Sequence, residues 1–282
     1  MNALLLISII LGVSAQDITK KMYNKKVSAP GVYVFTTLSA VTAAVFFALT
    51  SGSLDFNLGI LPYSVAFAVA YTTGVVGSVV AIASGPLSLT TLIVSFSLML
   101  PTLYGLVFLN DPISLGLFPG IALLTASLFF INRCDKGVKI NTKWLISVTF
   151  AFLGNGFCTI FQKMQQIRFD GNYKNEFMII ALAITALAAG VMTLIKERDL
   201  IGKQGVLGCS LGVICGAANG AVNLFVMILS GLMPVSLMFP IISAGGIVAT
   251  FIISQVFYKE KLSRPQLIGF ILGTASVVLL NL

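Results

Sequence analysis

Long apolar segments separated by short polar loops run along the whole chain. Two stretches of 55 residues, Phe56 to Asn110 and Gln204 to Tyr258, contain no charged residue. Each is long enough for two membrane-spanning helices, which need about 20 apolar residues apiece. Each is interrupted near its middle by a Gly-Pro signal, in SGPLSL at Ser84 to Leu89 and in SGLMPVSL at Ser230 to Leu237, as expected of a turn between two helices.

This pattern predicts an all-α integral membrane protein with ten transmembrane helices. Ten spans of about 20 residues account for most of the 282 residues and leave only short loops. We expect the spans at residues 2–18, 31–51, 59–83, 87–109, 112–132, 144–165, 176–195, 205–229, 234–257 and 264–282.

The chain also carries an internal repeat. The two charge-free stretches begin 148 residues apart, and residues match at nearly the same offset. The matching pairs are Pro86 and Pro234, Ser88 and Ser236, Gly120 and Gly269, Asn132 and Asn281, Leu11-Gly12 and Leu153-Gly154, and Lys21-Met22 and Lys163-Met164. We predict a first five-helix repeat at residues 1–132, a basic connecting loop at 133–143 and a second five-helix repeat at 144–282. An odd number of helices in each repeat inverts the second one relative to the first.

The first fifteen residues allow a second interpretation. Their apolar run ends in Val13-Ser14-Ala15, which resembles a signal-peptidase cleavage site. The segment lacks the positively charged leading region of a signal peptide, and it matches the sixth span, so a retained helix is favoured. A cleaved segment would leave nine helices and break the symmetry of the repeat.

Composition and charge agree with a membrane protein. Hydrophobic residues make up 57% of the chain and charged residues only 9%, whereas soluble domains carry about a quarter charged residues. The net charge of +8 comes from basic residues in loops beside the helices, where positive charge retains a loop in the cytoplasm. We therefore expect a multi-pass protein of the cell membrane, with the lipid bilayer and not nucleic acid around it.

Residues that bind metals or catalyse reactions are scarce. The chain has no histidine, and Cys134, Cys158, Cys209 and Cys215 lack the spacing of a metal site, so we expect free thiols. It has no Asp-rich diphosphate motif, P-loop or nucleophile elbow. We predict no cofactor, no metal and no enzymatic activity.

Polar residues near the middle of the spans mark a candidate binding site. They are costly at that depth, and repeat-built transporters bind substrate near the midplane where the repeats meet. The candidate substrate-binding residues are Tyr71, Thr72, Ser95, Asn155, Asn219, Asn223 and Ser243, with Thr73 and Ser97 beside them. At offset 148, Tyr71 corresponds to Asn219 and Ser95 to Ser243. For a single serine or threonine, helix packing or a bond to its own backbone is the alternative.

Acidic residues are absent from the middle of the spans. Asp17, Asp111, Glu176 and Glu260 all lie at predicted span ends beside basic residues or Pro112, where we expect solvated interfacial charges. Asp17, next to Gln16, is the one that could lie a turn inside and bind substrate or a coupling ion. Without a buried carboxylate, exchange of a proton for a cationic drug is poorly supported, so we expect a neutral or zwitterionic small-molecule substrate.

Glycines recur every four residues along the eighth span, at Gly208, Gly212, Gly216 and Gly220. Such a stripe without side chains lets another helix backbone approach closely. Helix packing is the favoured interpretation, and hinge flexibility of the span is the alternative.

The layout resembles the drug/metabolite transporter superfamily, in particular its ten-helix EamA-like transporter branch, over the whole chain. In that family each half ends in a span, a short acidic turn and a final Gly-containing helix. The second half here reads VFYKEKLSRPQLIGFILGTASVVLLNL from Val256, and the first half reads FLNDPISLGLFPGIALLTASLFFIN from Phe108. Asp111 stands where the family usually has Glu, and GVSAQDITKKM at Gly12 lacks the usual aromatic-glycine start.

The resemblance implies secondary transport of small metabolites, often amino acids, or drugs outward through a central cavity. That cavity is lined in the family by helices one, three, four, six, eight and nine, which carry the candidate residues above. A non-transporting structural or assembly membrane protein is the alternative. A continuous polar cavity that reaches the midplane would favour the transporter, and a filled interior would favour the scaffold.

The charge pattern and the resemblance predict opposite orientations. Loops after the odd-numbered spans hold 14 of the 17 basic residues, namely Lys20, Lys21, Lys25, Lys26, Arg133, Lys136, Lys139, Lys143, Lys196, Arg198, Lys203, Lys259, Lys261 and Arg264. The opposite side holds Lys163, Arg168 and Lys174. This bias predicts that both termini face outward. The resemblance implies that both termini lie in the cytoplasm.

Overall fold

The computed structural model describes residues 2–52, 54–84, 90, 93–94, 96–110, 115–132, 141–258 and 264–280, and within these ranges it contains helices and no strand. The elements are α1 (Asn2–Lys26), α2 (Val32–Thr50), the 3₁₀ helix η1 (Leu58–Ile60), α3 (Leu61–Ser84), α5 (Met99–Phe108), α6 (Leu117–Asn132), α7 (Thr142–Arg168), α8 (Lys174–Lys196), α9 (Arg198–Ile201), α10 (Gly205–Ser230), α11 (Val235–Tyr258) and α12 (Arg264–Leu280).

Six of these helices are long and apolar enough to cross a membrane: α1, α2, α3 together with η1, α7, α8 and α10. Shorter apolar helical stretches lie at Met99–Phe108, Leu117–Ser127 and Val235–Gly246. The prediction of an all-α membrane protein is confirmed at this level. The predicted turn near Pro234 is also confirmed, because α10 ends at Ser230 and α11 begins at Val235.

The first helix is longer than the predicted span 2–18. It continues to Lys26 because its second half also buries side chains, with Thr19 6% and Tyr23 0% exposed. The Tyr23 hydroxyl donates to the Gly31 carbonyl oxygen at 2.9 Å and accepts from the Gly31 N–H at 3.0 Å, which anchors this end of the helix. Asp17, expected at a span end, therefore lies inside α1.

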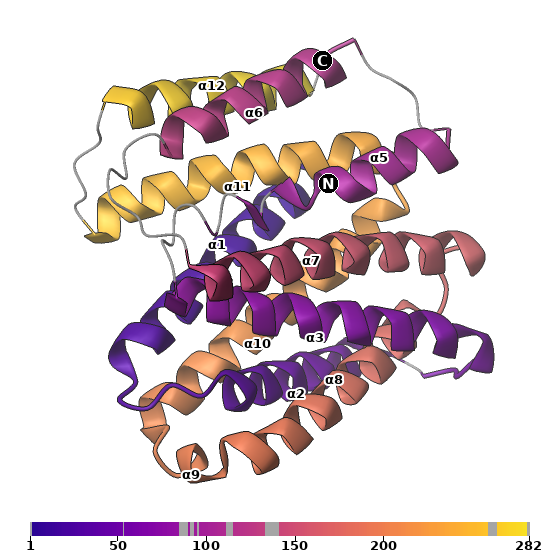
Figure 1. The fold of residues 1–282 in the computed structure, drawn as a ribbon. Helices are drawn as coiled ribbons and strands as arrows, with labels where there is room; N and C mark the ends of the chain where they lie inside the picture. Colours follow the sequence, from indigo (N-terminus) through magenta and orange to yellow (C-terminus); the bar gives the residue numbers. More distant parts are fainter. Residues whose placement is uncertain are drawn as a thin grey trace.

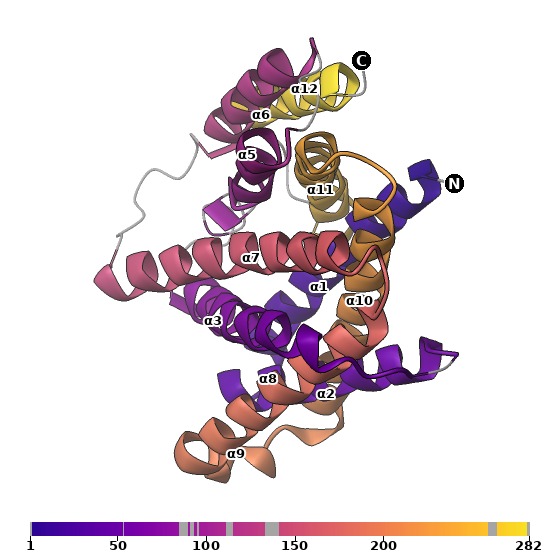
Figure 2. The ribbon, with the colours of Figure 1, turned by 90° about the vertical axis from the view of Figure 1, so that its right-hand side faces the viewer.

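The helices pack in pairs (Figures 1 and 2). The main pairs are α3 with α7, α1 with α10, α2 with α8, α6 with α12, α10 with α2, α3 with α8, and α11 with α1, α5 and α12. In both views the α6–α12 pair lies at one edge of the molecule and α2, α8 and α9 lie at the opposite edge. Helices α1, α7 and α10 lie in the middle of the molecule, between these two edges.

Three glycines of the α10 stripe, Gly212, Gly216 and Gly220, pack against α2. A Cβ atom on Gly216 would lie 2.5 Å from the backbone oxygen of Ser39, and one on Gly220 would lie 2.7 Å from the Phe46 ring. The Ser39 hydroxyl also donates to the Gly212 carbonyl oxygen at 3.2 Å. The close approach of the two helices needs these glycines, so the helix-packing interpretation is confirmed.

Glutamates hold the α2–α8 pair at both ends. At one end, the Glu197 carboxylate after α8 accepts the N–H groups of Val32, Tyr33 and Val34 at 2.9–3.0 Å, which caps the first turn of α2. At the other end, Glu176 in the first turn of α8 accepts the Asp55 N–H at 3.0 Å. The two helices are therefore antiparallel.

The burial of Glu176 corrects a prediction. We expected a solvated interfacial charge, but the residue is only 6% exposed. Its carboxylate accepts the backbone N–H of Asp55 in the loop after α2, and its negative charge lies in the first turn of α8, at the positive end of that helix. Asp111 and Glu260 lie outside the described residues.

Helices α6 and α12 exchange reciprocal hydrogen bonds. The Ser127 hydroxyl on α6 donates to the Gly269 carbonyl oxygen on α12 at 2.6 Å. The Ser276 hydroxyl on α12 donates to the Gly120 carbonyl oxygen on α6 at 2.7 Å. Later residues of one helix meet earlier residues of the other, so this pair is antiparallel as well.

Candidate functional site

Four amide side chains from α1, α7 and α10 form a continuous chain of hydrogen bonds, which we call the amide chain. The Gln162 amide nitrogen on α7 donates to Asn223 Oδ1 at 2.7 Å. The Asn223 amide nitrogen donates to Asn219 Oδ1 at 3.0 Å, and the Asn219 amide nitrogen donates to Gln16 Oε1 on α1 at 3.1 Å. Asn219 and Asn223 can both take part because residues four apart share a helix face.

The amide chain lies inside the helix bundle. Gln16 and Asn219 are 8% exposed, Gln162 is 1% exposed, and Asn223 is half-buried. Each amide side chain carries both a donor and an acceptor. The amide chain can therefore bind a polar molecule that donates or accepts hydrogen bonds. Polar groups buried in a membrane helix bundle are satisfied by other helices or mark a substrate path.

An ion pair lies beside the amide chain. The Lys20 ammonium lies 3.4 Å from the Asp17 carboxylate, one turn along α1 and next to Gln16. Both side chains are mostly buried, with 14% of Lys20 and 26% of Asp17 exposed. Asp17 is nine residues from the end of α1 at Lys26, or about 14 Å at 1.5 Å per residue. The Asp17 carboxylate therefore lies along α1 and not at its end, paired with Lys20.

The end of α7 adds further polar groups. Lys163, next to Gln162, donates to the Ser230 carbonyl oxygen at 2.6 Å, at the last turn of α10. Gln165 and Gln166 are 0% and 6% exposed, and Gln165 donates to the Asn172 carbonyl oxygen at 2.8 Å. The polar run QKMQQ at 162–166 was the available sequence signal for Gln162. It lay at the end of the predicted span, outside the mid-span window that we considered.

Asn155 and Thr72 form hydrogen bonds to groups outside the amide chain. The Asn155 amide nitrogen donates to the Ser97 hydroxyl at 2.7 Å, toward the segment before α5. The Thr72 hydroxyl donates to the Ala68 carbonyl oxygen at 2.7 Å and lies 3.5 Å from the Thr185 hydroxyl on α8. These contacts hold helices together, so the hydrogen bonds of Asn155 and Thr72 lead away from the amide chain.

Tyr71, Ser243 and Ser95 complete the set. Tyr71 belongs to an apolar cluster, where its ring stacks on Phe67 with centroids 5.6 Å apart. Ser243 is buried on α11 at 5% exposure. Ser95 lies outside the described residues. The structure thus brings the candidates Asn219 and Asn223 together with Gln16 and Gln162. Gln16 and Gln162 were not among the candidates.

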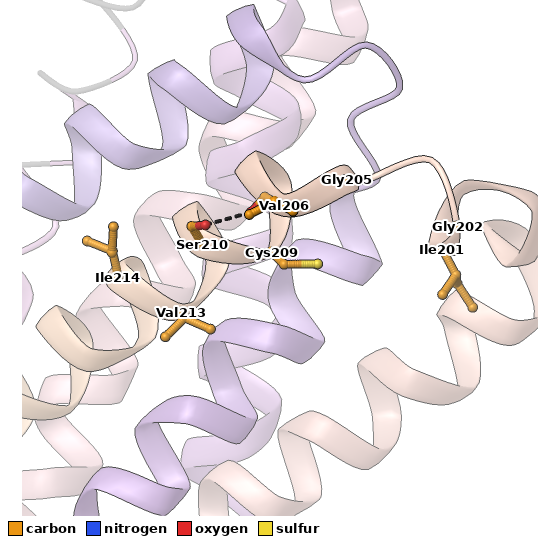
Figure 3. Close-up of a pocket in the computed structure, with 8 residues that line it drawn as sticks. All are labelled: Ile201, Gly202, Gly205, Val206, Cys209, Ser210, Val213 and Ile214. Atoms are coloured by element: carbon orange, nitrogen blue, oxygen red, sulfur yellow. Dashed lines mark hydrogen bonds between the residues drawn. The ribbon is translucent and has the colours of Figure 1, made fainter.

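A separate groove opens on the outer surface at α9 and the start of α10 (Figure 3). It has a volume of about 820 Å³. It is lined by Ile201, Gly202, Gly205, Val206, Cys209, Ser210, Val213 and Ile214. No residue of the amide chain lines it, so the groove and the amide chain are distinct features.

Searches of protein-family models and of curated proteins found no match to this chain. Among solved structures, the chain is similar to one described only as "Crystal structure of protein", with a TM-score of 0.74 and 13% sequence identity over 98% of both chains. A likeness at this identity shows a shared fold over the full length. It carries no information about substrate or activity.

Proposed function

We propose that this protein is a secondary transporter that moves a small neutral or zwitterionic metabolite, amino-acid-like or drug-like, across the cell membrane. The amide chain carries the proposal, because it places four uncharged polar side chains inside a bundle of apolar helices. The bond between Asn219 and Gln16 also joins the second half of the chain to the first. A substrate that takes over this bond would couple its binding to the contact between the halves.

The proposal includes ten spans arranged as two inverted five-helix repeats. Equivalent helices of inverted repeats are antiparallel, because the axis that relates them lies in the membrane plane. The antiparallel pairs α2–α8 and α6–α12 support this arrangement. Ser127 and Ser276 are offset by 149 residues, as are Gly120 and Gly269. The proposed repeat therefore relates the bond from Ser127 to Gly269 to the bond from Ser276 to Gly120.

Close glycine contacts support the same symmetry. A Cβ atom on Gly154 of α7 would lie 2.5 Å from the Ala70 backbone oxygen and 2.5 Å from the Gly74 nitrogen on α3. On α10, the residues that correspond to Ala70 and Gly74 at offset 148 are Ala218 and Val222. A Cβ atom on Gly12 of α1, the equivalent of Gly154, would lie 2.5 Å from Val222 Cγ2 and 3.8 Å from the Ala218 oxygen. The α3–α7 contact and the α10–α1 contact thus use matching positions.

The resemblance to the EamA-like branch of the drug/metabolite transporters fits this reading. The helices that carry the amide chain correspond to the first, sixth and eighth spans, which line the transport cavity in that family. The family expectation is transport outward, so we propose export. The Asp17–Lys20 ion pair beside Gln16 offers opposite charges to a zwitterion, whereas a substrate with a net charge would lack a free counter-ion there.

A non-transporting structural or assembly protein is the second candidate. It is favoured by the fact that the amide side chains bond one another, and by the position of the described groove on the outer surface rather than at the amide chain. In a scaffold the amide chain would only fix the packing of α1, α7 and α10.

Reconstitution of the purified full-length chain in liposomes tests the two candidates. The panel contains labelled amino acids, nucleosides, polyols and cationic drugs. We expect uptake of at least one neutral or zwitterionic compound above that of empty liposomes. We expect Asn223→Ala to reduce it at least tenfold while the protein remains folded. Thr149→Ala is the matched control, because Thr149 is exposed on α7 and bonds its own backbone at Leu145.

Each contrary result is informative. No transport of any compound in the panel would favour the scaffold. Transport that survives Asn223→Ala would remove the amide chain from the substrate path while leaving the transporter proposal intact.

Orientation has its own test. We propose from the charge bias that both termini face outward. A reporter that is active only in the cytoplasm, fused after Leu282, should then give no signal. A strong signal would establish the orientation implied by the family resemblance.

A further inference from the structure

The outer groove at α9 and α10 is independent of the proposed transport path. On α10 its lining consists of Val206, Cys209, Ser210, Val213 and Ile214, mostly spaced three or four residues apart along one face. Figure 3 shows the Cys209 thiol pointing from α10 toward the side on which Ile201 and Gly202 lie. Val206 is 86% and Val213 46% exposed, so this apolar face is open to the surroundings of the protein.

Two glycines line the groove. A Cβ atom at Gly202 or at Gly205 would meet no atom within 4 Å, so the connection between α9 and α10 leaves open space beside its backbone. Gly205 has a φ angle of +60°, which side-chain-bearing residues rarely adopt. The lining is apolar in effect, because the Ser210 hydroxyl donates to the Val206 carbonyl oxygen of its own helix.

Basic residues flank the groove at the end where α10 begins. Arg198 and Lys203 are both exposed. Lys203 directly follows the lining residue Gly202, and Arg198 precedes Gly202 by four residues, one turn along α9. The nearby Glu197 carboxylate is occupied by the N–H groups of α2. Asp199, also exposed, lies between Arg198 and Lys203 in the sequence, so the two basic residues outnumber one acidic residue there. The groove therefore combines an apolar floor along a candidate membrane span with a net positive charge at the span end.

This combination matches the two parts of an anionic phospholipid. An acyl chain can lie along the Val206–Ile214 face, which rises about 12 Å at 1.5 Å per residue. The phosphate then lies at the end of the span, where basic residues near a membrane surface attract anionic lipid head groups. The charge bias places this loop among those that we expect on the cytoplasmic side.

We propose that the groove between α9 and α10 is a binding site for one anionic phospholipid of the surrounding bilayer. Its acyl chain packs on Val206 and Val213, and its phosphate is bound by Arg198 and Lys203. The site would hold a lipid in a defined position at the start of α10, the helix that also carries Asn219 and Asn223.

Protection of Cys209 from alkylation tests the site. The full chain carries Cys134→Ser, and Cys158 and Cys215 are buried, so maleimide reports on the exposed Cys209. The delipidated protein in neutral detergent receives either phosphatidylglycerol or phosphatidylcholine. We expect phosphatidylglycerol to slow modification at least fivefold and phosphatidylcholine to slow it less than twofold.

Variants separate the site from general charge attraction. Double replacement Arg198→Gln with Lys203→Gln should abolish the difference between the two lipids, and Val213→Trp should lower protection by filling the groove. Lys143→Gln, which removes an exposed basic residue at the start of α7, is the matched control and should keep the protection. Melting temperatures without lipid verify that every variant is folded.

Three results would overturn the proposal. One is equal protection by both lipids, and another is equal loss in the Lys143→Gln control. The third is protection of Cys209 without lipid that rises with protein concentration together with a doubled particle mass, because the occupant would then be a second copy of the chain.

Discussion

The contact between α1 and α10 and the contact between α3 and α7 are built alike but carry different chemistry. Gly12 on α1 faces Ala218 and Val222 of α10. The equivalent Gly154 on α7 faces the corresponding residues of α3, Ala70 and Gly74. Beside Gly12, however, lies the polar contact between Gln16 and Asn219, whereas the corresponding positions beside Gly154 are Cys158 and Tyr71, in an apolar cluster.

The difference separates the backbone packing that both contacts share from the polar contact that only one of them has. Small residues recur in both contacts because two helix backbones can approach only where no side chain intervenes. The amides of the α1–α10 contact do not recur in the α3–α7 contact, because Cys158 and Tyr71 occupy the positions that correspond to Gln16 and Asn219. The amide chain on α1, α7 and α10 is thus an asymmetric feature of an otherwise repeated contact.

The largest expected effect comes from filling the tighter of the two contacts. A Cβ atom at Gly154 would meet the backbone of Ala70 and Gly74 at 2.5 Å, and backbone atoms cannot move aside. Gly154→Ala should cost about 3 kcal/mol, the upper end for overpacking. Gly12→Ala should cost less, because its nearest neighbour is a Val222 side-chain methyl. Thermal unfolding in detergent measures both, and equal losses would contradict this account.

The two ends of the α2–α8 pair should also differ. The Glu197 carboxylate accepts three N–H groups at the positive end of α2, whereas Glu176 accepts one. Glu197→Gln should therefore destabilise the protein by about 2 kcal/mol, in the range for hydrogen bonds to a charged group. Glu176→Gln should cost less, since an amide oxygen can still accept one bond. Melting temperatures would contradict the ranking if Glu176→Gln were the more harmful change.

The amide chain and its apolar counterpart give a third comparison. Asn223→Ala removes hydrogen bonds worth about 1 kcal/mol in membrane bundles. Val75→Ala, at the equivalent position of the first repeat, should cost a similar amount through lost packing. We expect transport in liposomes to fall at least tenfold only in Asn223→Ala. Equal transport loss in both variants would mean that stability, rather than recognition, explains the effect.

The smallest expected effect concerns the reciprocal bonds of α6 and α12. Ser127→Ala and Ser276→Ala should each cost about 0.6 kcal/mol, the average for such bonds in a membrane protein. The bonds lie seven residues apart along each helix, so the double variant should be additive. Unfolding free energies that differ several-fold between the two single variants would break the symmetry on which the repeat rests.

Much of the fold followed from the hydropathy pattern. The turn at Pro234 and most helix bounds agree with the predicted spans within a few residues. The extension of α1 to Lys26 was missed, because Tyr23 is buried through contacts outside the helix, with Gly31 in the following loop and with Gln204 far along the chain. Hydropathy reports average polarity and cannot register such partners.

The amide chain was predicted less completely. Asn219 and Asn223 were identified because their spacing places them on one helix face, but Gln16 and Gln162 were not, since each lies near a span end. The sequence alone also treated Tyr71 as polar, whereas its ring packs on Phe67. The environment of a side chain depends on which helix faces it, and that is a long-range property.

The sequence by itself determined that this is a helical membrane protein with long apolar segments and a repeated order of small and polar residues. Local hydropathy and spacing suffice for this, because the bilayer requires each spanning segment to satisfy its own backbone. The tertiary structure alone decided that Gln16, Asn219, Asn223 and Gln162 form one chain and that Glu176 is buried. These contacts join residues up to 203 positions apart, so only the packing of helices against one another could bring them together.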